Sequence, residues 1–369
     1  MGPTVLAYPG SPKPGQARGL CQTGPVKRMV AGLGAATLVF TGCAHYVDGA
    51  AKAGPPAGDQ AFFFAGEVPV YGQTVSDNDK AVLAYLRAMR RIDVCGLVDR
   101  QSLAKIGEIR SLGTLYALDE CDFEIKLPGA AASRFVSVQV ALDRADELPS
   151  FRAGPTTIYE TAPDSCEYLV PLDLSHLPGA TPLHKPDQSF VRVGLIGAAE
   201  CDLTKKVAVA VAERVTAGPL PARDGIAVYP TPLAERDPCE VLAPLASEVD
   251  HWDVDRTRPY ECEFGVWRDG DAEVLSTRVA LEPKIVDIAT YGKQLQVRDG
   301  ADIYLDPTFC SAISFVGPQM QRRSAGGDFV DIADLVVRPA VVVDSGDAGC
   351  AGEDKLVVEI AATAAKLFG

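Results

Sequence analysis

Cysteine is the residue type whose number and spacing in this chain most directly imply chemistry. Eight of the ten cysteines fall into two sets of four, which are Cys95, Cys121, Cys166 and Cys201, then Cys239, Cys262, Cys310 and Cys350. The intervals are 26, 45 and 35 residues in the first set and 23, 48 and 40 in the second. An even count at repeated intervals favours disulfides in an exported chain. A zinc site is disfavoured, because the chain has no Cys-x-x-Cys and its histidines do not accompany the cysteines.

Four cysteines allow three pairings in each set, and we favour first with second and third with fourth. The predicted bonds are Cys95–Cys121, Cys166–Cys201, Cys239–Cys262 and Cys310–Cys350. The first bond of each set would join the start of a helix to the opening strand. The second would join a strand to the start of the last helix. In the chain-entropy account, loops of these lengths contribute roughly 3–4 kcal/mol each to stability.

The segments around the cysteines also repeat, which indicates an internal duplication. The matching pairs are residues 93–98 with 237–242, 120–123 with 261–264, 140–143 with 279–282, and Ile158-Tyr159 with Ile303-Tyr304. We therefore expect two domains, residues 61–222 and 223–369, with the boundary at the Pro/Gly-rich segment 218–221.

Signals for catalysis are few. The chain has no G-x-S-x-G, no glycine-rich phosphate loop, no H-E-x-x-H and no S-x-x-K. His251 and Trp252 are candidate ligand-binding residues, although a polar loop anchored by the indole explains them more simply. The segment 269–271 is expected to be a hairpin turn rather than a calcium loop. No cofactor and no metal site are expected.

Two connections between third and fourth cysteines differ between the copies. The first, residues 177–186, is proline-rich, and His176 and His184 flank its Pro178 and Pro182 in a loop. The second, residues 319–327, is basic and is expected to be flexible. Its adjacent Arg322 and Arg323 are candidates for binding an anionic wall or lipid group. Binding residues tend to lie on such loops, so the two copies could differ in function; neutral drift after duplication is the alternative.

The hydrophobic pattern predicts that each copy is α+β, formed by a helix, several antiparallel strands and a closing helix. Residues 76–79 are suitable as an N-cap for a helix over 80–89, and a short helix is expected from Cys95 to Ile109. Strands are expected at 121–127, 134–142, 166–172 and 190–196. The closing helices are expected at 204–216, where valines leave a strand reading open, and at 355–368.

The N-terminal segment has the features of an export signal. Residues 30–40 are apolar or small, too few to span a bilayer, and Lys27-Arg28 precede them. Small residues then lead to Cys43, which resembles the lipidation motif of bacterial lipoproteins, although Phe40 stands where leucine is usual. An uncleaved apolar segment is the alternative. Residues 1–42 are therefore expected to comprise an over-extended start, with Val26 as the true initiator, plus a signal peptide. Residues 43–60 would be a flexible tether.

Charge limits the class of partner. The first 42 residues hold four basic and no acidic side chains, so without them the formal charge of −14 becomes −18. An acidic surface without a basic stripe repels the phosphate backbone of nucleic acids. Nucleic acid is therefore not among the expected partners.

The motif Asp237-Pro238-Cys239 followed by Val241-Leu242, with Cys262-Glu263-Phe264 further on, resembles the opening of uncharacterised actinobacterial envelope lipoproteins. The first copy departs from it, with Val94 in place of proline. The resemblance implies an extracytoplasmic domain with paired cysteines and no catalytic residues. The sequence thus favours a lipid-anchored protein on the outer face of the cell membrane. It would be a non-enzymatic module that binds or senses a wall component, a lipid or an exported protein. The alternative is an extracytoplasmic hydrolase whose site assembles from distant residues.

Overall fold

The computed structural model describes most of the chain from residue 59 onward. The described residues are 59–369 without 115, 146–147, 163–164, 184–187, 197–199, 224–230, 268–273, 321, 325–328, 331–335 and 346–353, and the backbone alone is described for 196, 322–324 and 329–330. Cys43, the leader and residues 43–58 of the expected tether lie outside the described residues, whereas residue 60 at its end is helical. Among the described helices, none combines the length and the apolar character that crossing a bilayer requires.

The first half contains three helices and seven strands, with two short 3-10 helices. In chain order these are η1 (Gln60–Phe62), α1 (Asp77–Arg90), η2 (Val94–Leu97), α2 (Arg100–Ala104), β1 (Glu108–Gly113), β2 (Glu120–Lys126), β3 (Arg134–Asp143), β4 (Ser150–Ala153), β5 (Thr156–Glu160), β6 (Tyr168–Pro171), β7 (Gln188–Ile196) and α3 (Cys201–Ala217).

The second half opens on 3-10 helices and closes on an α-helix. Its elements are η3 (Pro232–Glu235), η4 (Pro238–Leu242), β8 (Val249–Trp252), β9 (Glu261–Trp267), β10 (Val274–Ile285), α4 (Val286–Thr290), β11 (Gln294–Arg298), β12 (Ala301–Asp306), β13 (Ser311–Phe315), β14 (Arg322–Ser324), β15 (Phe329–Val330), β16 (Val337–Ser345) and α5 (Asp354–Phe368).

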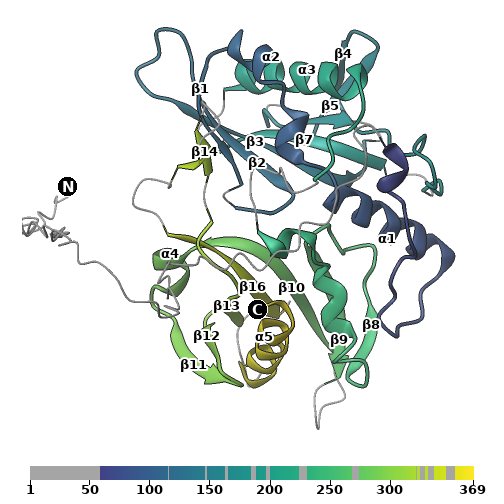
Figure 1. Cartoon of the computed structure of the whole chain (residues 1–369), viewed down its shortest axis with the longest axis vertical. Helices are drawn as coiled ribbons and strands as arrows, with labels where there is room; N and C mark the ends of the chain where they lie inside the picture. The colour runs from purple at the N-terminus through teal and green to yellow at the C-terminus, as the bar shows by residue number, and fades with distance from the viewer. Residues whose placement is uncertain are drawn as a thin grey trace, which may run out of the picture. The chain divides into compact units, whose positions relative to one another are not determined.

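The strands form two antiparallel sheets, which confirms the α+β class. The nine-stranded sheet has the order β15-β14-β1-β2-β3-β7-β6-β5-β4, and the seven-stranded sheet has the order β11-β12-β13-β16-β10-β9-β8. Helix α3 packs on strands of the first sheet and α5 on strands of the second (Figure 1). The order β4-β5-β6-β7-β3-β2-β1 in the first sheet corresponds strand by strand to the order β11-β12-β13-β16-β10-β9-β8 in the second.

The register is also the same in both sheets. Cys121 lies opposite Val138, and Cys262 lies opposite Val279. On the neighbouring strands, Val138 faces Val193, as Val279 faces Val343. Sequence matching aligns Val140 with Val279, but strand pairing places Val138 there, so that match is wrong by two residues. Because β3 and β10 both carry apolar residues at alternate positions, a shift of two residues still aligns apolar with apolar residues.

Local sequence explains why α1 begins where it does. The Ser76 hydroxyl accepts from the Asp79 backbone N–H at 3.2 Å, and the Asp79 carboxylate accepts from the Ser76 N–H at 3.1 Å. This reciprocal capping box satisfies two N–H groups at the helix start. The helix expected over 80–89 is therefore confirmed as Asp77–Arg90, with Tyr85, Leu86 and Met89 among its buried residues.

Other expectations about individual elements were wrong. The helix expected from Cys95 to Ile109 ends at Ala104, and β1 follows it. Strands β4 and β5 were not predicted, since both are short and mostly half-exposed. Residues 322–324, expected in a flexible loop, form β14, which pairs with β1 of the other half. Only 3-10 helices open the described part of the second half, where the first half has α1.

One apolar core runs through both halves. A single cluster of buried residues includes Leu86 and Phe123 from the first half and Phe264 and Val343 from the second. Because this cluster is continuous, part of the apolar surface of each half is buried against the other, while two smaller clusters lie within single halves.

Candidate functional site

The cysteines that the sequence singled out are structural. Disulfides join Cys95 to Cys121, Cys166 to Cys201 and Cys239 to Cys262. Cys310 is also disulfide-bonded. Because Cys350 lies outside the described residues, the Cys310–Cys350 bond stays a prediction. Cys166 and Cys310, the third cysteines of the two sets, share a positive φ, of 56° and 46°.

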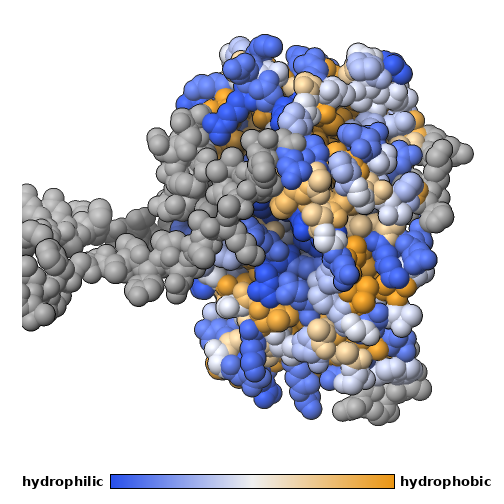
Figure 2. Space-filling view, turned by 45° about the vertical axis from the view of Figure 1, so that its right-hand side comes forward, coloured by the Kyte–Doolittle hydropathy of each residue, from blue (hydrophilic) through white to orange (hydrophobic). Residues whose placement is uncertain are grey.

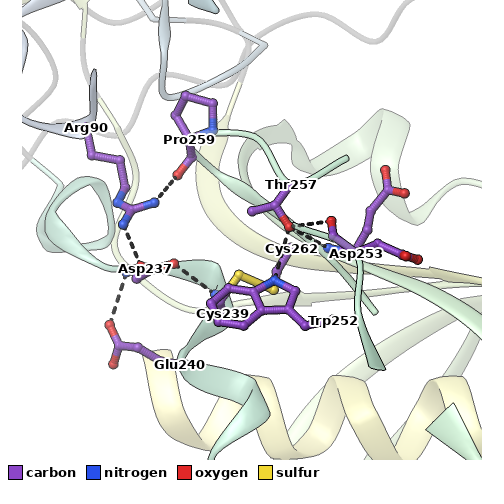
Figure 3. Close-up of a disulfide and its surroundings, with 10 residues drawn as sticks. Arg90, Asp237, Cys239, Glu240, Trp252, Asp253, Thr257, Pro259 and Cys262 are labelled. Carbon is purple, nitrogen blue, oxygen red and sulfur yellow. Dashed lines mark hydrogen bonds and ion pairs between the residues drawn. A yellow bond between two sulfur atoms is a disulfide. The ribbon is translucent and has the colours of Figure 1, made fainter. Parts of the chain in front are cut away.

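The Asp-Pro-Cys motif forms a junction between the halves (Figure 3). Asp237 accepts from the Cys239 N–H at 3.0 Å, and Glu240 accepts from the Asp237 N–H at 3.0 Å, so a capping box fixes η4 beside the disulfide. Arg90 of α1 donates to the Asp237 carboxylate and, at 2.9 Å, to the Pro259 carbonyl. These contacts hold the two halves together.

A second buried arginine completes this junction. Arg223 donates to the Ala234 carbonyl at 2.8 Å, to the Leu118 carbonyl at 3.2 Å, and to the hydroxyl of Tyr260. Both Arg223 and Tyr260 are buried. The guanidinium thus connects carbonyls from the two halves, which sequence reasoning did not foresee because a lone arginine in a linker carries no pattern.

His251 and Trp252 are neighbours in sequence, but Trp252 packs against the core and His251 faces solvent. Trp252 donates its indole N–H to Thr257 at 3.2 Å and packs against the core, as the anchoring interpretation predicted. His251 is half-exposed on the edge strand β8, with Asp250 at 2.9 Å and Asp253 at 3.4 Å. These carboxylates, the Asp250 hydrogen bond first, raise the pKa of His251 above 6.5.

Two other groups of candidate residues are placed only in part. The backbone of Arg322 and Arg323 lies in β14. Residues 269–271 lie outside the described residues, between β9 and β10, which pair as a hairpin. Within the described residues, no cluster of three or more His, Cys, Asp or Glu side chains is placed to hold a metal ion.

The largest described cavity, about 1000 Å³, lies in the first half. It is bounded by the end of β6, the starts of β5 and β7, the C-terminal end of α3, and α1. Tyrosines, threonines and aliphatic side chains form most of its wall, among them Tyr85, Thr157, Tyr159, Leu172 and Val215. Its size and mixed lining are typical of small-molecule sites. In Figure 2, which turns the α1 side forward, apolar side chains lie in separate patches among polar ones.

A serine, a histidine and an aspartate meet at this cavity, but not in a catalytic order. The Ser175 hydroxyl donates directly to Asp173 at 2.6 Å, and the Asp173 carboxylate lies 3.8 Å from the Nδ1 atom of His176. A serine nucleophile needs its hydroxyl beside the imidazole, with the carboxylate on the far side of the ring. Here the carboxylate lies between them, and Asp173 and His176 are about two-thirds exposed. The arrangement is a turn held by a side chain.

The sequence places His176 in a loop, but no pattern in it predicts the other residues that line this cavity. Its wall comes from five separated segments of the first half, and no spacing rule joins them. The one available signal was the proline-rich connection after Cys166. Comparisons with protein-family models, curated proteins and solved structures find no match for this chain.

Proposed function

We propose that this chain is an exported cell-envelope lipoprotein, anchored through acylated Cys43 on the outer face of the membrane, that acts as a non-enzymatic binding or sensing module. The observation that carries the binding role is the first-half cavity, large and mixed in lining, whose Ser175, Asp173 and His176 are ordered for a turn rather than for nucleophilic attack. An extracytoplasmic hydrolase is the alternative.

The proposal includes two tandem copies of one unit. The equal succession of strands, the equal register around Cys121 and Cys262, and the positive φ at Cys166 and Cys310 support a duplication. Strand β14 crosses to the first sheet, so the copies would work as one body. A relation to actinobacterial envelope lipoproteins is part of the same proposal, supported by Asp237-Pro238-Cys239.

Export is supported by the disulfides. Three disulfides are typical of chains that fold in an oxidising compartment. The proposed anchor would keep the domain at the membrane, where a wall component, a lipid or an exported protein is the expected ligand.

The anchor is tested by expressing the full chain and its Cys43→Ser variant with an alkyne fatty acid. We expect labelling and membrane fractionation of the first and neither for the second, with His45→Ser as a nearby control that keeps both. Membrane-bound Cys43→Ser protein without label would contradict the anchor.

The binding role is tested by native mass spectrometry of protein purified from the envelope. A non-covalent small-molecule adduct, released on denaturation, is the expected result. Turnover of ester or amide substrates that is lost in Ser175→Ala and His176→Ala would instead support the hydrolase.

A further inference from the structure

The second half has its own cavity at the position of the first one. It measures about 310 Å³ and is lined by Tyr304, Phe315 and Arg338, among others. Strand pairing makes these residues the counterparts of Tyr159, Pro171 and Gln188, which line the larger cavity. On the same strands, Thr156 and Thr157 correspond to Ala301 and Asp302. The two threonines line the larger cavity, and Ala301 and Asp302 line the smaller one.

The smaller cavity is narrowed by two bulky substitutions. Phe315 stands where the first half has Pro171, and Arg338 stands where it has Gln188. The Arg338 guanidinium lies 5.2 Å from the centre of the Phe315 ring, and its Nε donates to the Gly317 carbonyl at 3.0 Å. This stacked, hydrogen-bonded arginine occupies space and brings positive charge.

The larger cavity has the opposite charge. Neither lysine nor arginine is among its described lining residues, and Asp173 is the carboxylate there. Hydrogen bonds from Ser175 hold the pKa of Asp173 below its usual range, so this group is ionised at neutral pH. A cation is therefore favoured over an anion in this space.

The end of α3 adds hydrogen-bond acceptors to the same wall. The carbonyls of Val215 and Ala217 would normally accept from residues 219 and 221, but both are proline and carry no N–H. The Leu220 N–H, the natural donor to Thr216, donates to Gln60 at 3.1 Å instead. Arg214 in the last turn donates to the Pro219 carbonyl, so the carbonyls of Val215 and Ala217, whose residues line the cavity, are the ones left to a ligand at this helix C-terminus.

Tyr85 supplies an independent sign of a ligand. This side chain lines the cavity and is only 2% exposed. Its hydroxyl finds no hydrogen-bond partner among the described residues. A buried hydroxyl without a partner costs about 1–3 kcal/mol, and a ligand group that reached it from the cavity would recover this free energy.

We propose that the first-half cavity binds a small molecule with an apolar body and a cationic, hydrogen-bond-donating end, and that Phe315 and Arg338 exclude such a ligand from the second. The inference rests on the proposed binding function and names its ligand class. The tyrosine, leucine and valine side chains receive the apolar body, while Asp173 and the α3 carbonyls receive the cation.

The test uses isothermal titration calorimetry of the full-length protein in detergent micelles, with empty micelles as the blank. The probes are 2-phenylethylamine, 2-phenylethanol and 3-phenylpropanoate, which share a body and differ in the polar end. We expect the amine to bind about tenfold more tightly than the carboxylate, as a charge-assisted hydrogen bond implies, with the alcohol between them.

Variants locate the binding. Gln188→Arg introduces the residue of the second half and is expected to abolish amine binding, while Gln188→Ala retains it. Tyr85→Phe removes only the hydroxyl and should weaken the amine about fivefold without loss of thermal stability. Tyr304→Phe in the second cavity is the matched control and should change nothing.

Equal affinity for amine and carboxylate, absence of binding by all three probes, or unchanged binding in Gln188→Arg would overturn the inference. A native small-molecule adduct found together with any of these results would leave the binding function standing and remove only the ligand class. Absence of both the adduct and probe binding would remove the binding function too.

Discussion

Arg90 of α1 lies 2.5 Å from the carboxylate of Asp237, so an ion pair joins the first half to the Asp-Pro-Cys turn of the second. The two side chains are 9% and 15% exposed. Such a pair has lost most of its hydration, and each charge depends on the other and on carbonyls such as that of Pro259.

Arg90→Met is expected to lower the free energy of unfolding by about 3 kcal/mol, because it leaves the Asp237 carboxylate buried without its partner. Urea unfolding measures this. The control is Lys80→Met, which breaks the exposed pair with Asp77 and should cost less than about 0.5 kcal/mol. A similar loss in both variants would show that the buried pair has no special weight. One cooperative transition is expected throughout, because the halves share a core.

The free energy of unfolding is expected to fall as pH rises from about 4 to 8. The cause is two carboxyl groups, Asp119 just before β2 and Glu120 at its start. Burial raises the pKa of Asp119 to about 7, and burial together with neighbouring Asp122 raises that of Glu120 to about 8. Both folded pKa values lie above the unfolded ones, so the folded state binds more protons in this window. Below it both states are protonated, and above it the full cost of burying charge applies.

Asp119→Asn and Glu120→Gln should each flatten this dependence, as measured by urea midpoints at pH 5.5, 7 and 8.5. Glu108→Gln, on the exposed part of the neighbouring strand β1, serves as the control and should leave the slope unchanged. An unchanged slope in both test variants would mean that these carboxyl groups do not titrate in the window.

The imidazole of His251 is expected to titrate above pH 6.5 by NMR. Its hydrogen bond to Asp250 is the largest cause, and the charge of Asp253 adds to it. Asp250→Asn should therefore lower the pKa of His251 more than Asp253→Asn does. Identical titration curves in wild type and Asp250→Asn would refute the hydrogen bond.

Non-reducing peptide mapping is expected to find Cys310 joined to Cys350, alongside the three disulfides already placed. The reason is the equivalence of Cys310 with Cys166, whose bond reaches the first residue of the closing helix α3. A free thiol at Cys350, seen by alkylation before reduction, would break the correspondence between the halves. Cys350→Ala should then leave the urea midpoint unchanged, whereas loss of a disulfide typically costs about 2–4 kcal/mol.

The sequence by itself determined the local and repeated features of this protein. Cysteine spacing predicted three pairs that the structure contains, and 3.6-residue periodicity with Ser76 and Asp79 predicted α1. Apolar patterns also predicted β2, β3, β6, β7 and α5, and they favoured a helix at α3 while leaving a strand there open. These features depend on residues near one another in the chain or on a repeat that can be read directly.

Only the tertiary structure decided how the halves combine and where a ligand could bind. Strand β14 joins the other half's sheet, and Arg90, Arg223 and Tyr260 meet across the junction, although up to 170 residues separate Tyr260 from its partner Arg90. Tyr85, Tyr159 and Val215 reach one cavity from α1, β5 and α3. Long-range packing brings such residues together through a shared core, and the energy of that core depends on the shape of facing surfaces, which periodicity in the sequence does not encode.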